Sequence, residues 1–493
     1  MPKDNKKIRK QPNQHLPCPP KEVLAPDIAA GWCLNLSDVE IHRRILKTLD
    51  KTRYGLSIRQ ELSYNTARSK DMTYEVAYPV LVAKRGFFQN VGYEELRKII
   101  KQENGLRIPR RLIKEFCHSE EPDLIAERLH RRLVRRVFWA AGVNDVCCFD
   151  QHDKLQRFGI RLHTGLDPYS GRIHWMRVSY TNRNPVLIAS YYLNFVEDLG
   201  AMPLVTQSDP GTENVGIANA HTVLCQLHDP SLEGTLQHRT MRNKMNIPPE
   251  IIWAQFRKRL SPALERVISE GFDNGMIDSK NDLDTFIFRY IFFPWIQEEL
   301  DGFVDRVNWN RKRNDRRKVH PQGPPHDIFF CPEEYGVKDF KVLVDLAFLA
   351  EVRARYAPPD HPVFQLYPPE FRKLADEFSK ELDLPVPGRG NVWQVFQTLQ
   401  NAFWDYFGAR TNNSAVWPSM NSSAPSRPED DHWQLIPHHR VVPDYVVPSH
   451  FVERDPVQEE LDDTLYFNHE GEGIPVITAF SDEGVEEFRG AWF

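Results

Sequence analysis

The spacing of apolar residues predicts a sheet with covering helices in the middle of the chain. Isolated apolar residues within polar runs are typical of half-buried strands, and apolar residues at helical spacing are typical of helices. The pattern predicts three strands, one helix, a fourth strand and then more helix. After a first strand that ends near Asp150, the predicted elements are strands over residues 157–166 and 172–179, a helix over 185–199, a strand over 204–208 and a helix from Glu250.

Three carboxylates stand at the ends of these predicted elements. Asp150 and Asp209 each follow a short apolar run, and Glu250 stands where a long amphipathic pattern begins. Carboxylates at the ends of neighbouring strands, with one more on a covering helix, can converge on one edge of a sheet. Hard cations such as Mg²⁺ prefer oxygen ligands, and two ions about 3.5–4 Å apart can stabilise both reacting oxygens of a phosphodiester displacement. A second interpretation stays open, because both aspartates could simply be turn residues.

Three blocks of residues carry a family resemblance. They are residues 150–155, residues 209–214 with the sequence Asp-Pro-Gly-Thr-Glu-Asn, and residues 246–253, with shorter matches between residues 160 and 310. In these blocks the chain resembles the integrase core of the DDE superfamily, which has a ribonuclease H-like fold, in the transposon-derived form found in eukaryotic genomes.

The resemblance implies both a fold and a site. The fold would be an α/β, mixed five-stranded sheet flanked by helices, with a helical region before it and a helical extension after it. Asp150, Asp209 and Glu250 would be the catalytic residues and also the ligands of Mg²⁺ or Mn²⁺. DNA would be the substrate and partner of a homo-oligomer that uses no small-molecule cofactor.

Several positions depart from the family's pattern. Cys147, Cys148 and Gln151 replace an aromatic residue before the first acid and a glycine after it, and a proline pair at 248–249 replaces Arg-Ile before the third acid. Proline is tolerated in the first helical turn, so Glu250 is expected at the start of a helix that begins late. The missing arginine removes a phosphate contact. We therefore expect metal binding to persist and strand transfer to be weak, as in a decaying or domesticated transposase.

Two segments before the predicted core could contact nucleic acid. Residues 93–100 and 108–116 predict two helices joined by a turn at Gly105, and this helix-turn-helix pattern is used by many DNA-binding proteins. Ordinary helical packing gives the same pattern. The arginine-rich residues 128–136 favour phosphate contacts, although a solvated helix face is the alternative.

The basic residues 308–318 form a third such segment, in which Trp309 could stack on a base. A surface loop is the alternative there. Lys154 could reach a phosphate or pair with Asp153. The predicted DNA-contacting residues are Arg110, Arg111, Arg131, Arg132, Arg135, Arg136, Lys154, Arg311, Lys312 and Arg313.

Composition and charge limit the kinds of site, partner and cellular location that the chain can have. The net charge of −5 is not typical of a nucleic-acid-binding protein, so local patches of charge matter more than the total charge. Seven cysteines without a Cys-x-x-Cys pair argue against a disulfide framework or a zinc module. No apolar run approaches the roughly 20 residues of a membrane span, so no membrane partner is expected. The basic residues 6–10 suggest a nuclear protein, although a solvated tail fits equally well.

The chain of 493 residues has room for more than one domain. We expect a disordered basic tail (1–36), a helical region with the helix-turn-helix pattern (37–140), an integrase-like catalytic core (141–330), a helical extension (331–410), and a linker with a largely disordered acidic tail (411–493). The leading hypothesis is an integrase- or transposase-like enzyme that acts on DNA phosphodiester bonds with reduced activity. The alternatives are a domesticated, non-catalytic DNA-binding protein and a protein-interaction scaffold.

Overall fold

The computed structural model separates the chain into two compact units. Unit 1 comprises Met1–Arg85 and Tyr93–Pro122, and unit 2 comprises Gly86–Gly92 and Asp123–Phe493. The structure describes residues 19–20, 23–24, 27–28, 38–49, 53–54, 72–89, 91–106, 108–122, 140–241, 246–310, 321–408 and 433–437. None of the helices within these ranges combines the length and apolarity needed to cross a lipid bilayer.

Unit 1 is helical where it is described. Its helices are α2 (Asp38–Thr48), α4 (Tyr74–Phe87, whose last two residues belong to unit 2), α5 (Tyr93–Asn104) and α6 (Arg110–Glu120). The amide of Gly105, with φ 64°, donates to the Lys101 carbonyl at 3.0 Å and ends α5. Buried apolar residues of α5 and α6, such as Ile100 and Phe116, pack the two helices together. The expected pair of helices with a glycine between them is therefore present.

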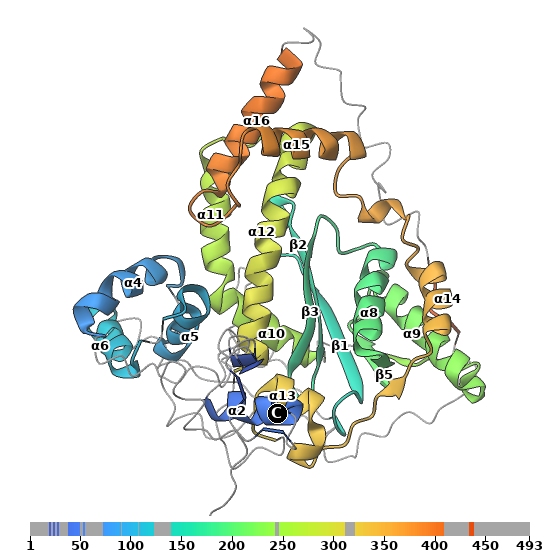
Figure 1. Cartoon of the computed structure of the whole chain (residues 1–493). Helices are drawn as coiled ribbons and strands as arrows, with labels where there is room; N and C mark the ends of the chain where they lie inside the picture. The colour runs from blue at the N-terminus through green and yellow to red at the C-terminus, as the bar shows by residue number, and fades with distance from the viewer. Residues whose placement is uncertain are drawn as a thin grey trace, which may run out of the picture. The chain divides into compact units, whose positions relative to one another are not determined.

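Unit 2 is built on a mixed five-stranded sheet, as the sequence predicts (Figure 1). The strand order is β3-β2-β1-β5-β6, with β1 antiparallel to β2, β2 antiparallel to β3, and β5 parallel to both β1 and β6. The strands are β1 (Val146–His152), β2 (Arg161–Asp167), β3 (Arg172–Ser179), β5 (Val205–Ser208) and β6 (His238–Thr240).

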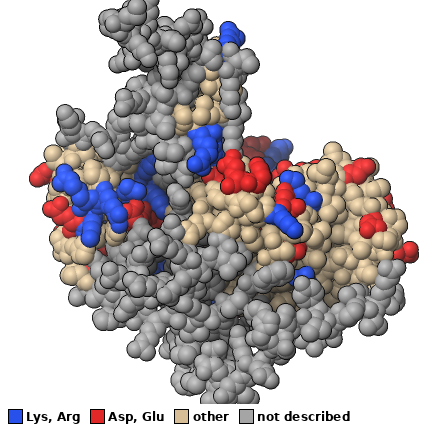
Figure 2. Space-filling view, turned by 90° about the horizontal axis from the view of Figure 1, so that it is seen from below, with Lys and Arg blue, Asp and Glu red and all other residues tan. Residues whose placement is uncertain are grey.

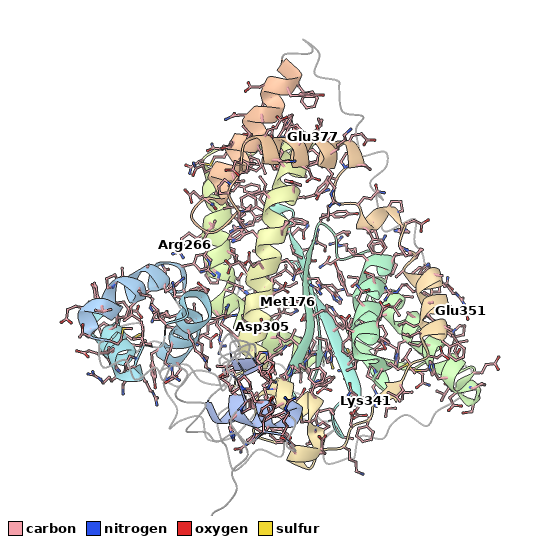
Figure 3. The ribbon with its side chains drawn as sticks, viewed as in Figure 1. Met176, Arg266, Asp305, Lys341, Glu351 and Glu377 are labelled. Carbon is pink, nitrogen blue, oxygen red and sulfur yellow. The ribbon has the colours of Figure 1, made fainter. Side chains whose placement is uncertain are left out.

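Helices cover both faces of this sheet (Figure 1). One face packs on α8 (Pro185–Leu199) and α9 (Val215–His228), with α14 (Leu346–Tyr356) outside them. The other face packs on α10 (Ile247–Arg259) and α12 (Asp282–Asn308), with α11 (Ser261–Asp273) beside α10. In Figure 3, Met176 marks β3 and Glu351 marks α14.

Shorter elements and the helical extension complete unit 2. They are η1 (Gln156–Phe158), β4 (Ala201–Met202), η2 (Pro230–Leu232), α13 (Pro325–Phe330), η3 (Pro332–Tyr335), β7 (Val342–Leu343), η4 (Pro362–Phe364), α15 (Pro369–Glu381) and α16 (Val392–Gly408). Strands β4 and β7 pair with each other, and α16 packs on α12 and α15.

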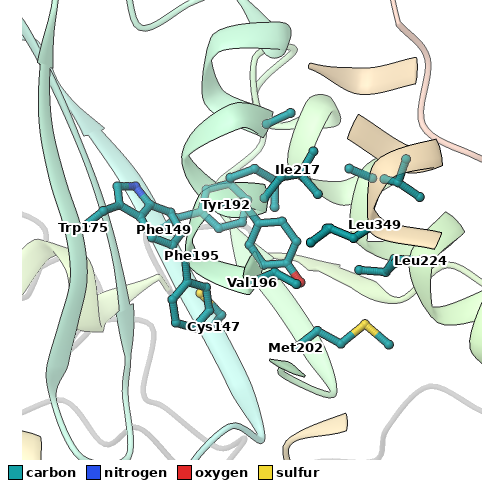
Figure 4. Close-up of a cluster of buried hydrophobic side chains, with 14 of the residues drawn as sticks. Cys147, Phe149, Trp175, Tyr192, Phe195, Val196, Met202, Ile217, Leu224 and Leu349 are labelled. Atoms are coloured by element: carbon teal, nitrogen blue, oxygen red, sulfur yellow. The ribbon is translucent and has the colours of Figure 1, made fainter. Parts of the chain in front are cut away.

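The main core lies between the sheet and α8, α9 and α14 (Figure 4). Phe149 of β1 and Trp175 of β3 meet Tyr192 and Val196 of α8 there, and all four side chains are buried. Helix α8 has clear sequence signals at both ends, because the Asn184 side chain accepts from two amides of the first turn and Gly200 ends the helix in the left-handed region.

Two predicted boundaries are wrong. The strand expected from residue 157 begins at Arg161, because residues 156–158 form a 3₁₀ turn that Gly159 closes with φ 70°. The helix expected from Glu250 begins earlier, at Ile247, and takes the proline pair into its first turn. Proline is well suited to this place, since its missing N–H would have no helical partner there.

Replacing Gly216 with alanine should destabilise unit 2. A Cβ at this position of α9 would lie 2.1 Å from the Pro185 carbonyl oxygen, where α8 and α9 approach each other. Since a backbone atom cannot move aside cheaply, we expect a loss of about 1–3 kcal/mol in the free energy of unfolding, measured by urea denaturation. Gly86→Ala is the matched control, because Gly86 lies in α4 with open space around it and should lose nothing. Equal midpoints for the two variants would contradict the close approach.

Candidate active site

The pairing of β1 with β5 brings two of the three acids together. The strands run parallel, and Cys148 lies opposite Gln207. Asp150 and Asp209 each come two residues later. Because side chains alternate between the faces of a sheet, Asp150 lies on the face of Cys148 and Gln207. Asp209 is the first residue after β5, and it lies close enough for its charge to raise the pKa of Asp150 beyond the effect of burial.

Helix α10 brings the third acid to the same place. Glu250 lies in its first turn. One turn further, the indole Nε1–H of Trp253 donates to Asp150 Oδ2 at 3.1 Å. Ahead of the helix, Asn246 Nδ2 donates to the Phe149 carbonyl at 2.9 Å. These two bonds tie the start of α10 to the end of β1, so Glu250 stands over the aspartates.

The three carboxylates interact electrostatically. Burial raises the pKa of Asp150 well above its usual range, and the negative charges of Asp209 and Glu250 raise it further, while bonds from the Gln151 amide and Trp253 partly oppose this. Burial also raises the pKa of Asp209. A cluster of acids that repel one another and are partly hidden from water is the setting in which a divalent cation would be bound.

The donor atoms suit a hard cation, although they are not assembled into a ligand shell. Asp209 Oδ1 is buried and has no hydrogen-bond partner in the described part of the chain, so it is available as a ligand. Within the described ranges, however, no three His, Cys, Asp or Glu side chains form a group that could hold a metal ion. Sharing of an ion by the three acids therefore stays a prediction, and it requires the side chains to move closer.

A polar network holds the loop after β5 against β1. Gln151 Nε2 donates to Glu213 Oε1 and to Asn214 Oδ1, the latter at 3.2 Å, and Asn214 Nδ2 donates to the Asp209 carbonyl at 2.8 Å. A Cβ on Gly211 would lie 2.2 Å from Glu213 Oε1, so glycine makes room for that carboxylate. Gln151, which departs from the family's pattern, thus links the segments that carry Asp150 and Asp209.

The neighbouring histidines are packing residues. His152 stacks on Trp253 with ring centroids 4.8 Å apart, and burial first, then the charges of Arg257 and Lys154, lowers its pKa to about 3. His163 accepts from Trp175 Nε1 at 3.0 Å, and burial lowers its pKa to about 3. Both rings are therefore neutral at physiological pH and lend no positive charge to the site.

Sequence reasoning missed two positioning residues. Trp253 ends the family block 246–253, and its place one helical turn after Glu250 could have suggested a contact with the site. Asn246 begins the family block 246–253, but its contacts depend on strands far away in the chain: it donates to β1 and also accepts from Gln207 Nε2 of β5 at 3.2 Å.

The residues predicted to contact DNA have different surroundings. The Arg110 guanidinium pairs with Glu94 at 2.8 Å and donates to the Tyr93 hydroxyl, so it is engaged within unit 1. Arg111 and Lys154 are exposed. The other seven lie outside the described residues: Arg131, Arg132, Arg135, Arg136, Arg311, Lys312 and Arg313.

Trp309 does not present its ring for base stacking. The side chain is buried, with 8% exposure, and stacks on His326 of α13 with ring centroids 3.7 Å apart. The expected stacking on a base is therefore wrong. On the face shown in Figure 2, lysine and arginine side chains of the described residues form separate patches with acidic side chains beside them.

Comparison with known proteins identifies the segment that contains this site. The family described as integrase core domain matches residues 137–330. The match includes all five strands of the main sheet, the three acids and α10 to α13, whereas unit 1 and α14 to α16 lie outside it. No curated protein matches the chain.

Asp150→Asn should stabilise the protein in the absence of divalent cations. The folded pKa of Asp150 is raised, so ionisation costs stability at a pH above the ordinary carboxyl value and costs nothing where the carboxyl is protonated in both states. Each pKa unit corresponds to about 1.4 kcal/mol. We expect a gain in the free energy of unfolding at pH 8 that shrinks as the pH falls toward 4, measured by urea denaturation.

Asp229→Asn is the control for this experiment. A side-chain bond from Ser231 and then one from its amide lower the pKa of Asp229. Its neutralisation should therefore give no gain at pH 8. A gain for Asp150→Asn that does not depend on pH would contradict the electrostatic explanation.

Proposed function

We propose that this chain acts on DNA phosphodiester bonds by metal-assisted phosphoryl transfer, because residues 137–330 match the integrase core domain family and form a mixed five-stranded, ribonuclease H-like sheet. Asp150, Asp209 and Glu250 are the proposed catalytic residues and metal ligands. The observation that carries the proposal is their gathering near the ends of β1 and β5, where burial first, and then the charges of the two other acids, raise the pKa of Asp150.

The surroundings of each acid suit the role of a metal ligand. Mg²⁺ or Mn²⁺ would supply charge neutralisation and Lewis acidity at the reacting phosphate. Trp253 orients the Asp150 carboxylate by donating to its Oδ2. Asn214 supports the backbone of Asp209. Glu250 lies in the first turn of α10, at the positive end of the helix dipole, where a carboxylate stabilises the helix.

We expect this activity to be weak. Pro248 and Pro249 are buried in the first turn of α10, at the positions where the family carries Arg-Ile. The chain therefore offers no guanidinium there to position a DNA strand, and a misplacement of about 1 Å can cost about 10²-fold in rate. The proposal further includes a homo-oligomer, a nuclear location and a transposon-derived origin in a eukaryotic genome.

A non-catalytic DNA-binding protein is the second candidate function. It is favoured by the buried proline pair 248–249 in the first turn of α10, where the family carries Arg-Ile. The gathering of the three acids supports a nucleic-acid function over a protein-interaction scaffold, since a scaffold needs no such cluster.

Strand transfer into a supercoiled plasmid in the presence of Mn²⁺ tests the catalytic proposal. We expect a low yield of nicked and joined products from the unmodified protein and at least a 100-fold lower yield from Asp209→Asn, because loss of one ligand removes the site for the cation. Products that are equally abundant with both proteins would show a contaminating nuclease. DNA binding without any product would favour the second candidate.

The salt dependence of DNA affinity tests the arginine-rich segment 128–136. Each phosphate contact contributes about 0.9 to the slope of log K against log salt concentration. Single alanine substitutions of Arg131, Arg132, Arg135 and Arg136 should each reduce the slope by about that amount in a fluorescence titration. Arg353→Ala is the control, because Arg353 is paired with Glu197 at 2.8 Å and should leave the slope unchanged. Unchanged slopes for all four would remove this segment from the DNA interface.

A further inference from the structure

A short segment far along the chain lies against the integrase-like core. Residues 433–437, with the sequence Trp-Gln-Leu-Ile-Pro, follow the last helix, α16, after an interval of residues 409–432. Their contacts are with α8, α9, α14 and η4. These helices cover the face of the sheet that carries Phe149, so the segment lies on the opposite face from Asp150.

The side chain of one asparagine of α9 hydrogen-bonds to the main chain of the segment. Asn219 Nδ2 donates to the Gln434 carbonyl at 2.8 Å, and the Ile436 amide donates to Asn219 Oδ1 at 3.0 Å. Asn219 is itself buried, with 4% exposure. A buried side-chain amide needs partners for its donor and its acceptor, and the segment supplies one for each. The side chains of Gln434 and Leu435 are exposed, so Asn219 contacts the segment through its backbone.

An indole at the first position adds a side-chain contact. Trp433 meets the Tyr356 ring of α14 edge-on, with centroids 5.2 Å apart and an interplanar angle of 88°. The same indole packs against Val186 and Leu187 of α8 and Val363 of η4. Trp433 thus packs against side chains from three elements of unit 2, next to the asparagine that hydrogen-bonds to the backbone.

We propose that the face formed by α8, α9 and α14 is a peptide-docking groove and that residues 433–437 are its ligand, bound within the same chain. Asn219 recognises the peptide backbone and the pocket around Tyr356 recognises the tryptophan. An interval of 24 extended residues can span roughly 80 Å, so the segment reaches the groove of its own chain. Tethering raises its effective concentration to about the millimolar range, which keeps the groove occupied in the unmodified protein.

A labelled peptide of residues 430–440 tests this proposal with full-length protein. We expect it to bind the Trp433→Ala protein, whose own ligand is weakened, at least 10-fold more tightly than the unmodified protein, as measured by fluorescence anisotropy. Absence of binding to the Trp433→Ala protein, or equal binding to both proteins, would overturn the proposal.

Two peptide variants test the backbone recognition without any risk to folding. Ile436→Pro in the peptide removes the N–H that donates to Asn219 and should abolish binding. Gln434→Ala is the matched control: it keeps the carbonyl that Asn219 contacts and should bind like the unmodified peptide. Equal binding of the proline variant would refute the role of Asn219.

A separate experiment tests whether residues 433–437 bind the groove of their own chain. Sedimentation of the unmodified protein over a range of concentrations should show no self-association that depends on Trp433. A dimer that forms with the unmodified protein and is lost with Trp433→Ala would overturn it, because the segment would then occupy the groove of a second copy.

Discussion

The parallel pairing of β1 with β5 is the constraint on which the candidate site depends. In this register Phe149 points into the core under α8, and Asp150 points to the opposite face beneath α10. A shift of one residue would exchange the two side chains, leaving a carboxylate in the core and a phenylalanine among the acids. The core therefore fixes the position of the acids, since burial of Phe149 against Tyr192 permits only one register.

Uncharged hydrogen-bond donors contact the segments that carry the mutually repelling carboxylates. Hydrogen bonds to these segments come from the indole of Trp253 and from the side-chain amides of Gln151, Asn214 and Asn246. Such donors orient carboxylates and backbone without neutralising charge, whereas a lysine or arginine would lower the need for a cation. In the proposed function, a bound cation would add charge neutralisation to this arrangement.

Sequence predicted the elements that have local signals. Strand β3 and helix α8 have the expected bounds, because alternation marks the strand, and Asn184 and Gly200 mark the ends of the helix. Strand β6 was not predicted, since its three residues are polar and it exists only through pairing with β5. The resemblance to the integrase family led to the prediction of the three acids as site residues. The contacts that position them, and the burial of Trp309 against His326, join residues far apart in the chain and leave no local pattern.

The docked segment bears on how a chain with a net charge of −5 could bind DNA. Residues 453–493 contain twelve acidic residues and two arginines, a net −10, so the rest of the chain carries −5 + 10 = +5. Trp433 and Ile436 fasten the polypeptide some fifteen residues ahead of this stretch, on the side of the sheet away from Asp150. The contacts of Trp433 and Ile436 therefore fix the last described attachment point before the acidic stretch, on the face of the sheet opposite Asp150.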